Sequence, residues 1–383
     1  MSSFIPYSRQ SVDEDDIKEV VAVLRSDYLT QGPKIMEFEI ALASYCGAKY
    51  AVVFSSGTAA LHGAYFAAGI GPGDEIITSP ITFAATANAA LYLGAKPVFA
   101  DIDPETGNID PELIERAITK KTKAVVPVHY AGHPANLDHL HDIARSRDLL
   151  VIEDACHALG ASYKGRKIGA LSDMTVFSFH PVKPITTGEG GAVLTGDRKF
   201  YERLLAFRSH GIVKGTAGFE ENPHGNWYYE MQMLGYNYRL TDIQCALGLS
   251  QLKKIDAFIK RRKEIVLSYA LAFKGNKWFD LPVMSGDAES SWHLYPIRFK
   301  GEFLARKALI FDRLRKAGLV VQVHYIPVYL HPYYKRLGYR EGICPAAEQF
   351  YRRQLSIPVH QGMDGADAEI VEKTISDVLG GFS

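Results

Sequence analysis

The stretch MTVFSFHPVKPITTGEGGAVLTG, residues 174–196, decides the fold. Its two ends, MTVFSFH and GAVLTG, are short apolar runs of the kind that form buried strands. Between them lies a single lysine, Lys183, flanked by Pro181 and Pro184 and followed by the run GEGG. Prolines and glycines favour a fixed turn. The stretch therefore predicts two strands joined by a tight connection that holds an amine at the end of an apolar strand.

Five further apolar runs precede this stretch and also read as buried strands: YAVVFSS (50–56), EIITSP (75–80), KPVFADI (96–102), KAVVPVHY (123–130) and LLVIEDA (149–155). Helical patterns such as TAALHGAYFAAG (58–69) and PELIERAI (111–118) lie between them. This alternation predicts an α/β domain with a large, mixed but mostly parallel sheet that is covered on both faces. Ligands of such sheets collect at the carboxyl ends of the strands.

The pattern changes after Thr241. The run TDIQCALGLSQLKKIDAFIKRRKEIVLSYALAF (241–273) predicts one long amphipathic helix. A strand (HLYPIRFK, 293–300), a helix (303–318), a second strand (LVVQVHYIP, 319–327) and a last helix are expected after it. We therefore predict a large domain over residues 1–245 and a smaller C-terminal α+β domain over residues 246–383. The aromatic, glycine-rich segment 211–239 is expected to be a long ordered loop, and such loops are often functional.

Composition limits the classes of function. The 383-residue chain has a formal net charge of zero and no block of either sign, which argues against non-specific binding to nucleic acid or to a membrane surface. We expect no metal site and no disulfide framework, because no two of the four cysteines have CxxC spacing: Cys46, Cys156, Cys245 and Cys344. The N-terminus lacks a signal pattern and no apolar run approaches a membrane span, so we expect a cytoplasmic protein.

The run SSGTAAL follows a strand and opens a helix. Gly57 permits a tight turn, and the backbone N–H groups of Thr58 and Ala59 are expected to be free. A helix N-terminus of this kind binds phosphate well. The alternative is an ordinary Ser/Thr N-cap, which is the commoner outcome for such a run taken alone.

Two more features follow strands. In VIEDACHA, Asp154 ends a very apolar strand, where a carboxylate is unfavourable unless it meets a cation or hydrogen-bond donors; the alternative is a helix N-cap. In TFAATANAALYLGA, Phe83 begins a helix, and core packing is the alternative to contact with a ligand.

The fourth feature is FSFHPVKP, with Ser178 and Lys183. Burial lowers the pKa of an amine and makes it nucleophilic, although a lysine that extends to the surface is the commoner case. Together the four features fit pyridoxal 5′-phosphate (PLP), which needs a Schiff-base lysine and an acidic partner for its ring nitrogen. The phosphate would meet Gly57, Thr58 and Ser178, the ring Phe83, the ring nitrogen Asp154 and the aldehyde Lys183.

The order SGTAAL, TF, EDACHA, SFHPVK, GEGG and GYNYRLTDIQCALGLSQL resembles the DegT-type sugar aminotransferases. The resemblance runs from YLTQGP, near Tyr28, to HYIPVYLHPYY, near His324. It implies PLP-dependent transferase fold type I, the aspartate aminotransferase fold, and activity on nucleotide-linked keto sugars. The wording SFHPVKPITTGEGGAVLTGD is similar to one subgroup, the UDP-4-amino-4,6-dideoxy-N-acetyl-β-L-altrosamine transaminases of pseudaminic acid biosynthesis.

The resemblance also implies roles for single residues. Lys183 would bind the cofactor as a Schiff base and move the proton, and Phe83 would stack on the ring. His157 would lie near the phenolic oxygen of the cofactor. Asn237 of GYNYR would reach the phosphate of the neighbouring subunit, which implies a homodimer with shared active sites. Relatives often carry alanine where this chain has Cys156, and a small residue there still fits against the ring.

Substrates follow from the same resemblance. The amino donor would be L-glutamate, and the acceptor would be a UDP-linked 4-keto-6-deoxy-N-acetyl-hexosamine. Its contacts would come from Thr30 in YLTQGP and from His324, Tyr325 and His331. Two alternatives stay open: an aminotransferase for another nucleotide-linked keto sugar, and a non-catalytic regulatory or binding protein that keeps the cofactor pocket. The intact pair Lys183 and Asp154 speaks against the second, because binding alone requires no Schiff base.

Overall fold

The centre of the molecule is a seven-stranded sheet. The computed structural model describes residues 4–215, 218–283 and 286–382. The strand order is β2-β10-β9-β6-β5-β3-β4. The strands are β2 (Tyr50–Phe54), β3 (Glu75–Thr78), β4 (Lys96–Phe99), β5 (Thr122–Val126), β6 (Leu150–Asp154), β9 (Met174–Ser178) and β10 (Gly191–Thr195). All seven predicted runs are strands of this sheet. Only β10 runs antiparallel to its neighbours, so the prediction of a mixed, mostly parallel sheet is confirmed.

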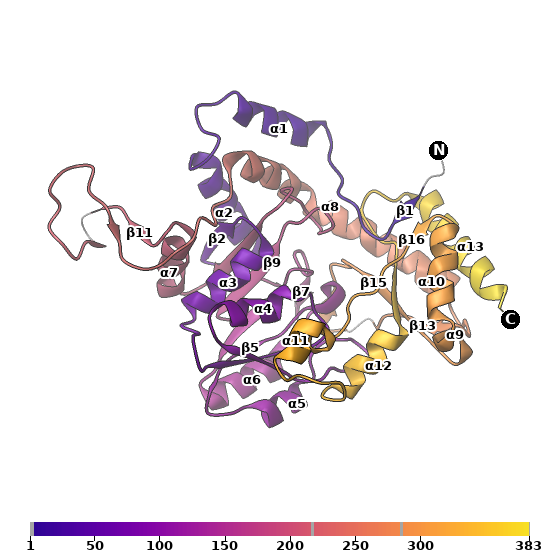
Figure 1. Cartoon of the computed structure of the whole chain (residues 1–383). Coiled ribbons are helices and arrows are strands. Elements are labelled where there is room, and N and C mark those ends of the chain that lie inside the picture. The colour runs from indigo at the N-terminus through magenta and orange to yellow at the C-terminus, as the bar shows by residue number, and fades with distance from the viewer. Residues whose placement is uncertain (1–3, 216–217, 284–285, 383) are drawn as a thin grey trace.

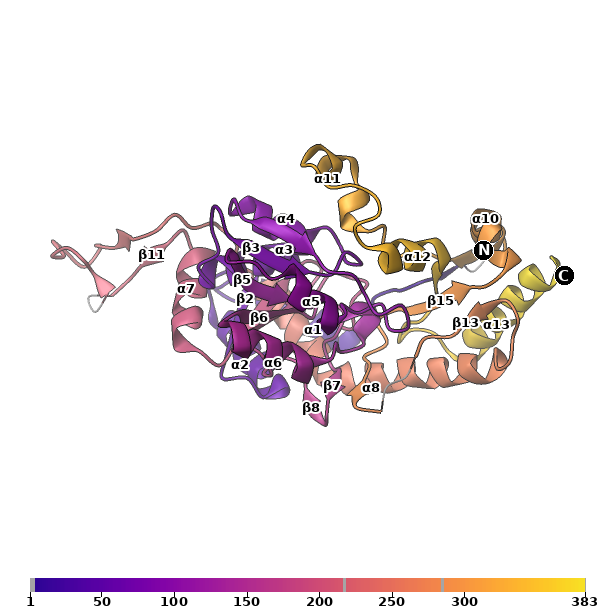
Figure 2. The same ribbon diagram turned by 90° about the horizontal axis from the view of Figure 1, so that it is seen from below.

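Helices cover both faces of the sheet, and Figure 2 shows α3 and α4 on one side with α2 and α6 on the other. Successive strand residues point to opposite faces, so Val53 packs against Phe38 and Leu42 of α2, whereas Val52 belongs to the core under α3. One face carries α2 (Pro33–Cys46), α5 (Pro111–Ala117) and α6 (Leu137–Arg147), and the other carries α3 (Gly57–Ala67), α4 (Ala85–Tyr92) and α7 (Arg198–Arg208). No helix of the described ranges combines the length and apolarity needed to cross a membrane.

The long helix α8 (Asp242–Ala272) links two hydrophobic cores, and Figure 1 shows it passing from the sheet into the C-terminal part. It begins with a capping box in which Thr241 and Gln244 bond each other's backbone N–H groups. Its first half packs Leu252 against the core of the sheet, and its second half packs Tyr269 into the C-terminal core. The prediction of one long helix is confirmed, while the boundary at residue 245 stays a prediction.

The C-terminal part is built on a small antiparallel sheet, β13-β15-β17. Its elements are β13 (Phe279–Asp280), β15 (Tyr295–Phe299), α9 (Glu302–Ala305), α10 (Lys307–Lys316), α12 (Pro345–Arg353), β17 (Gln354–Ile357) and α13 (Gly365–Gly380). The helix expected over 303–318 is two helices that meet at Arg306, and the strand expected over 319–327 is the short β16 (Leu319–Val320). The latter pairs in parallel with β1 (Ile5–Pro6), so the N-terminus joins this part of the molecule, and α1 (Glu14–Leu24) then packs on α8.

Segment 211–239 forms an arm that reaches away from the body of the molecule (Figure 1). It contains two short antiparallel strands, β11 (Ile212–Val213) and β12 (Glu230–Met231), where the sequence predicted only a loop. Residues 216–217 of this segment lie outside the described residues. Several large apolar side chains of the arm are exposed, among them Trp227, Tyr229 and Met231.

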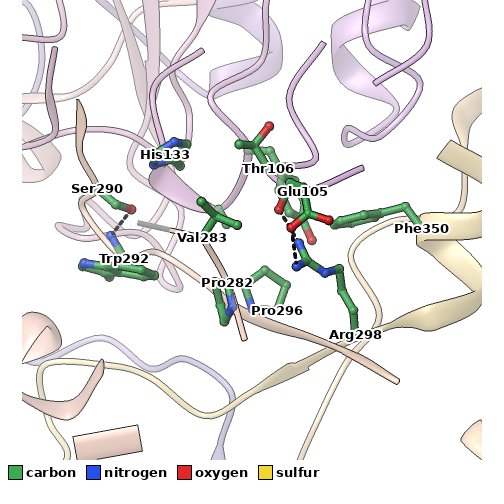
Figure 3. Close-up of a pocket in the computed structure, with 12 residues that line it drawn as sticks. Glu105, Thr106, His133, Pro282, Val283, Ser290, Trp292, Pro296, Arg298 and Phe350 are labelled. Atoms are coloured by element: carbon green, nitrogen blue, oxygen red, sulfur yellow. Dashed lines mark hydrogen bonds and ion pairs between the residues drawn. The ribbon is translucent and has the colours of Figure 1, made fainter. Parts of the chain in front are cut away.

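One buried arginine joins the small sheet to the large one. Arg298 of β15 donates to the backbone carbonyls of Pro104 and Glu105 and lies 3.3 Å from the Glu105 carboxylate. Figure 3 shows this contact at the edge of a small cavity lined also by His133 and Trp292. Its guanidinium thus links the C-terminal part to a connection of the large sheet.

The packing of α8 on α2 leaves no room at Gly248. A Cβ atom built there would lie 2.5 Å from Phe38 Cζ and 2.9 Å from Thr187 Cγ2. Because Phe38 is fully buried, we expect Gly248→Ala to lower the free energy of unfolding by about 1–3 kcal/mol, measured by urea denaturation. Gly380→Ala is the matched control, since a Cβ there meets nothing within 4 Å. Equal stability of the two variants would contradict this close packing.

Candidate active site

A cavity of about 630 Å³ opens at the carboxyl ends of β2, β6 and β9. It is lined by residues of all four features that the sequence singled out: Gly57, Thr58, Phe83, Asp154, Cys156, His157, Ser178 and Lys183, together with His324 and Tyr325 from the C-terminal part. The parallel direction of β6 and β9 brings their last residues to one edge of the sheet.

The turn before α3 forms a narrow cradle. A Cβ at Gly57 would lie 2.9 Å from Ser178 Cβ, and one at Gly191 would lie 2.6 Å from Ser56 O. Glycine at both positions therefore lets the turn lie directly on β9 and β10. The N–H of Ala59, predicted to be free, donates to Ser56 Oγ at 3.1 Å, because Ser56 caps the helix. The N–H groups of Gly57 and Thr58 belong to the first turn, where the helix offers no acceptor.

Several backbone contacts fix the segment that carries Lys183. The Lys183 N–H donates to His180 O at 2.8 Å, and Ser8 Oγ donates to Val182 O at 2.7 Å. In the described part of the chain no group accepts a hydrogen bond from Lys183 Nζ. Burial lowers the pKa of Lys183, while the nearby Cys156 and Asp154 act in the opposite direction. The amine is therefore held in place, partly desolvated and without a hydrogen-bond partner.

Asp154 ends β6 with its carboxylate facing the cavity. Its side chain is almost fully buried, and Oδ2 accepts a hydrogen bond from Thr86 Oγ1 at 2.6 Å. The other oxygen, Oδ1, accepts from the Cys156 N–H at 3.2 Å. Each oxygen of the Asp154 carboxylate therefore accepts a hydrogen bond that stabilises its position. Asp154 is not a helix N-cap.

Phe83 lies at the mouth of the cavity, 63% exposed, just before α4. Its ring centroid lies 6.3 Å from that of Tyr325. A phenylalanine with this exposure contributes little to the core of the sheet, so core packing does not account for it. The ring is available to stack on a flat ligand.

Three neutral histidines, His157, His293 and His324, pack together with Tyr325 beside the cavity, and we call this group the neutral wall. His157 Nε2 and Tyr325 Oη are hydrogen-bonded at 3.0 Å, and His324 Nδ1 bonds Ser356 Oγ at 2.9 Å. The ring of His293 packs 4.4 Å from that of His157. Burial lowers the pKa of His157 well below its usual range and that of His324 to about 3, and it raises the pKa of Tyr325. The wall thus adds no charge next to Lys183.

Four predicted residues do not line this cavity, and one of them, Ala59, is buried behind the turn that holds Gly57 and Thr58. Thr30 is exposed in the loop before α2, and the exposed Asn237 forms a backbone bridge with Ser209. His331 lies beside α11 (Pro332–Arg336), in a separate groove formed with residues of α4 such as Asn88. The order of residues in a sequence motif does not determine where each side chain points. For these residues the side-chain direction depends on tertiary packing.

Several residues that line the site were not predicted from the sequence, among them Tyr7 and Thr86. Tyr7 lines the cavity with its ring 5.0 Å from that of His324, and it comes from the N-terminal segment, which has no recognisable motif. Thr86 bonds Asp154 from α4. Thr86 comes three residues after Phe83, which lies just before the helix, and this spacing was the available signal.

The low pKa of His324 has a consequence for stability. Its pKa is about 3 in the folded chain and about 6.5 when exposed, so the unfolded state binds a proton that the folded state excludes between these values. Stability is therefore lost as the pH falls below 6.5. We expect His324→Asn to make the loss of unfolding free energy between pH 6.5 and 5 smaller by about 2 kcal/mol, measured on the cofactor-free protein. The exposed His139→Asn serves as the control, and equal pH slopes in both variants would contradict the assignment.

The geometry fits PLP. Glycines keep open a cradle at a helix N-terminus for the phosphate, and Phe83 offers a ring face. A carboxylate with both oxygens held, Asp154, and an amine without a hydrogen-bond partner, Lys183, line the same cavity. The pyridinium nitrogen of PLP requires an acidic partner, and its aldehyde requires an amine that can form a Schiff base.

Comparison with known proteins agrees with this fit. The chain matches the DegT/DnrJ/EryC1/StrS aminotransferase family over residues 10–376. It is 43% identical over 378 residues to the UDP-4-amino-4,6-dideoxy-N-acetyl-beta-L-altrosamine transaminase of Campylobacter jejuni subsp. jejuni serotype O:23/36 (strain 81-176), covering 98% of this chain and 97% of that protein.

Solved structures are similar over almost the whole chain. Helicobacter pylori PseC, an aminotransferase involved in the biosynthesis of pseudoaminic acid, has a TM-score of 0.93 at 38% identity, covering 99% of this chain and 100% of that one. Streptococcus pneumoniae Spr1654, solved in a PLP form and in a PMP form, has TM-scores of 0.92 and 0.93 at 33% identity with the same coverage. The chain therefore belongs to the DegT/DnrJ/EryC1/StrS aminotransferase family and is a PLP-dependent aminotransferase of fold type I.

Proposed function

We propose that this aminotransferase moves an amino group from L-glutamate to C4 of a UDP-linked 4-keto-6-deoxy-N-acetyl-hexosamine. The products are UDP-4-amino-4,6-dideoxy-N-acetyl-β-L-altrosamine and 2-oxoglutarate. One observation carries the chemistry: Lys183 and Asp154 line one cavity beside a phosphate cradle. Similarity over nearly the full length to a transaminase of that name supports the choice of substrate.

Lys183 is the proposed carrier of the proton. Amino transfer removes a proton from one carbon and returns it to another atom, and the cofactor, when bound, supplies the electron sink for this change. Because burial lowers the pKa of Lys183, a larger share of the amine is unprotonated near neutral pH and able to accept that proton. Its fixed backbone aims the amine into the cavity.

The other lining residues would bind and orient. Asp154 would hold a proton on the ring nitrogen, because an ionised carboxylate favours the charged form of its partner. Ser178 and the N–H groups of Gly57 and Thr58 would bind the phosphate, and Phe83 would cover one ring face. His157 would lie near the phenolic oxygen of the cofactor.

The proposed active unit is a homodimer in the cytoplasm. Asn237 is exposed and does not line the cavity of its own chain. A residue that contributes to the active site of a neighbouring subunit would have this position. The arm carries exposed apolar side chains such as Trp227, and α2 exposes Met36 and Ile40, each 61% accessible. Exposed apolar surface of this kind is typical of protein–protein contacts.

The substrate is tested with UDP-, GDP- and dTDP-linked keto sugars and L-glutamate, by following 2-oxoglutarate and the amino sugar. We expect the UDP-linked 4-keto sugar to react at least about tenfold faster than its competitors. Lys183→Ala and the charge-preserving Lys183→Arg should both be inactive while keeping the unfolding transition. Faster turnover of another sugar would reject the proposed substrate, and activity of Lys183→Ala would reject the role of Lys183.

The shared site is tested by mixing two variants that are each shown to be inactive, Lys183→Ala and Asn237→Ala. After subunit exchange, a heterodimer holds one site with both residues intact and one with neither. Random pairing should therefore restore about a quarter of the wild-type activity in a two-fold symmetric dimer. Exchange is confirmed by pull-down with a tag on one variant. Exchange without recovered activity would show that Asn237 does not serve the neighbouring site.

A further inference from the structure

A chain of buried hydroxyls leads to the carboxylate of Asp154. Thr86 Oγ1 lies 2.6 Å from Asp154 Oδ2, and Thr82 Oγ1 lies 2.7 Å from Thr86 Oγ1. All three side chains are buried, with at most 4% of each residue exposed. The two threonines come from α4 and the turn before it, whereas the carboxylate ends β6 on the sheet below.

The direction of these hydrogen bonds follows from chemistry. An ionised carboxylate only accepts, so Thr86 donates its proton to Asp154 and Thr82 donates to Thr86. The distance of 2.6 Å lies in the range of charge-assisted O–H···O⁻ bonds. With the Cys156 N–H on Oδ1, each oxygen accepts one protein hydrogen bond and keeps a lone pair for a ligand.

Thr86 is itself held in place. Tyr65 of α3 donates from its hydroxyl to Thr86 O at 2.9 Å, inside the core between α3 and α4. Phe83 lies three residues earlier, just before α4, and its carbonyl accepts a hydrogen bond from the Thr86 N–H at 3.2 Å. One short segment therefore positions both the aromatic ring at the cavity mouth and the donor to Asp154.

We infer that Thr86 is a positioning residue of this site: its hydroxyl aims the carboxylate of Asp154 at the ring nitrogen of the cofactor. The inference rests on the role proposed for Asp154. Without the donor, Asp154 Oδ2 would be left buried without its charge-assisted partner, a loss that corresponds to about a 10- to 100-fold change in an equilibrium. The carboxylate would then hold the ring proton less well and rotate more freely.

The test compares Thr86→Val, which keeps the shape of the side chain, with Thr86→Ser, which keeps the hydroxyl. Thr78→Val is the matched control: Thr78 of β3 is equally buried, but its hydroxyl donates to Val126 O on β5 and Thr78 does not line the cavity. Asp154→Asn is the reference for loss of the carboxylate. The readouts are the absorbance spectrum of bound PLP against pH without substrate, the affinity of the cofactor-free protein for PLP, and kcat and KM.

We expect Thr86→Val to lower kcat by about tenfold or more with little change in KM. It should also shift the absorbance transition in the same direction as Asp154→Asn, but less. Thr86→Ser should restore both readouts, and Thr78→Val should match the wild type. The titratable groups near Asp154 are common to all the variants, so they do not account for a difference between them: Tyr65, Cys156, Lys183 and Tyr325.

The role proposed for Asp154 and the inference about Thr86 would be contradicted by different results. If Asp154→Asn is impaired but Thr86→Val behaves as the wild type, the inference about Thr86 is overturned and the proposed function stands. If Asp154→Asn retains the wild-type spectrum and kcat, the role of Asp154 is wrong, and the inference falls with it. Equal losses in Thr86→Val and Thr78→Val, or no rescue by serine, would show a packing defect and also overturn it.

Discussion

A carboxylate at the end of a buried strand is the constraint on which this molecule depends. Asp154 is unfavourable in that place unless donors and a cation lie near it, and the surrounding elements supply them. Thr86 comes from α4, the Cys156 N–H follows the strand, and Lys183 belongs to the connection between β9 and β10. Because β6 and β9 run in parallel, all of these groups reach the same edge of the sheet.

The C-terminal part completes the site without adding charge to it. His324 bonds Gln354 and Ser356 on β17, so a polar strand edge holds the neutral wall of the cavity. Arg298 anchors the same sheet to the loop at Glu105. Lys183 and Asp154 therefore interact as the ionisable pair inside the cavity, while the lining residue Glu189 is exposed.

The fold was largely predictable because its signals are local. Most strands of the large sheet are buried on both faces, so they appear as apolar runs, and only the edge strand β4 begins with an exposed residue, Lys96. The strand β17 was not predicted, because it has only four residues and two of them, Gln354 and Ser356, are polar side chains whose burial depends on hydrogen bonds such as those to His324. Lys183 and Asp154 were found because their chemistry is unusual at a strand end. Tyr7 reaches the cavity through a distant strand pairing, and the side-chain directions of Thr30 and His331 depend on packing, so no local pattern indicates these three placements.

The pairing of β1 with β16 also determines when the chain can complete its folding during synthesis. Ile5 and Pro6 are made well before their partners Leu319 and Val320, which lie 314 residues further along the chain. At ribosomal rates of about 5–20 residues per second this gap lasts on the order of tens of seconds. The large sheet has all its strands by Thr195 and can form meanwhile, whereas Tyr7 takes its place in the cavity only after β16 has emerged. The catalytic cavity is thus among the last regions of the nascent chain to reach its final form.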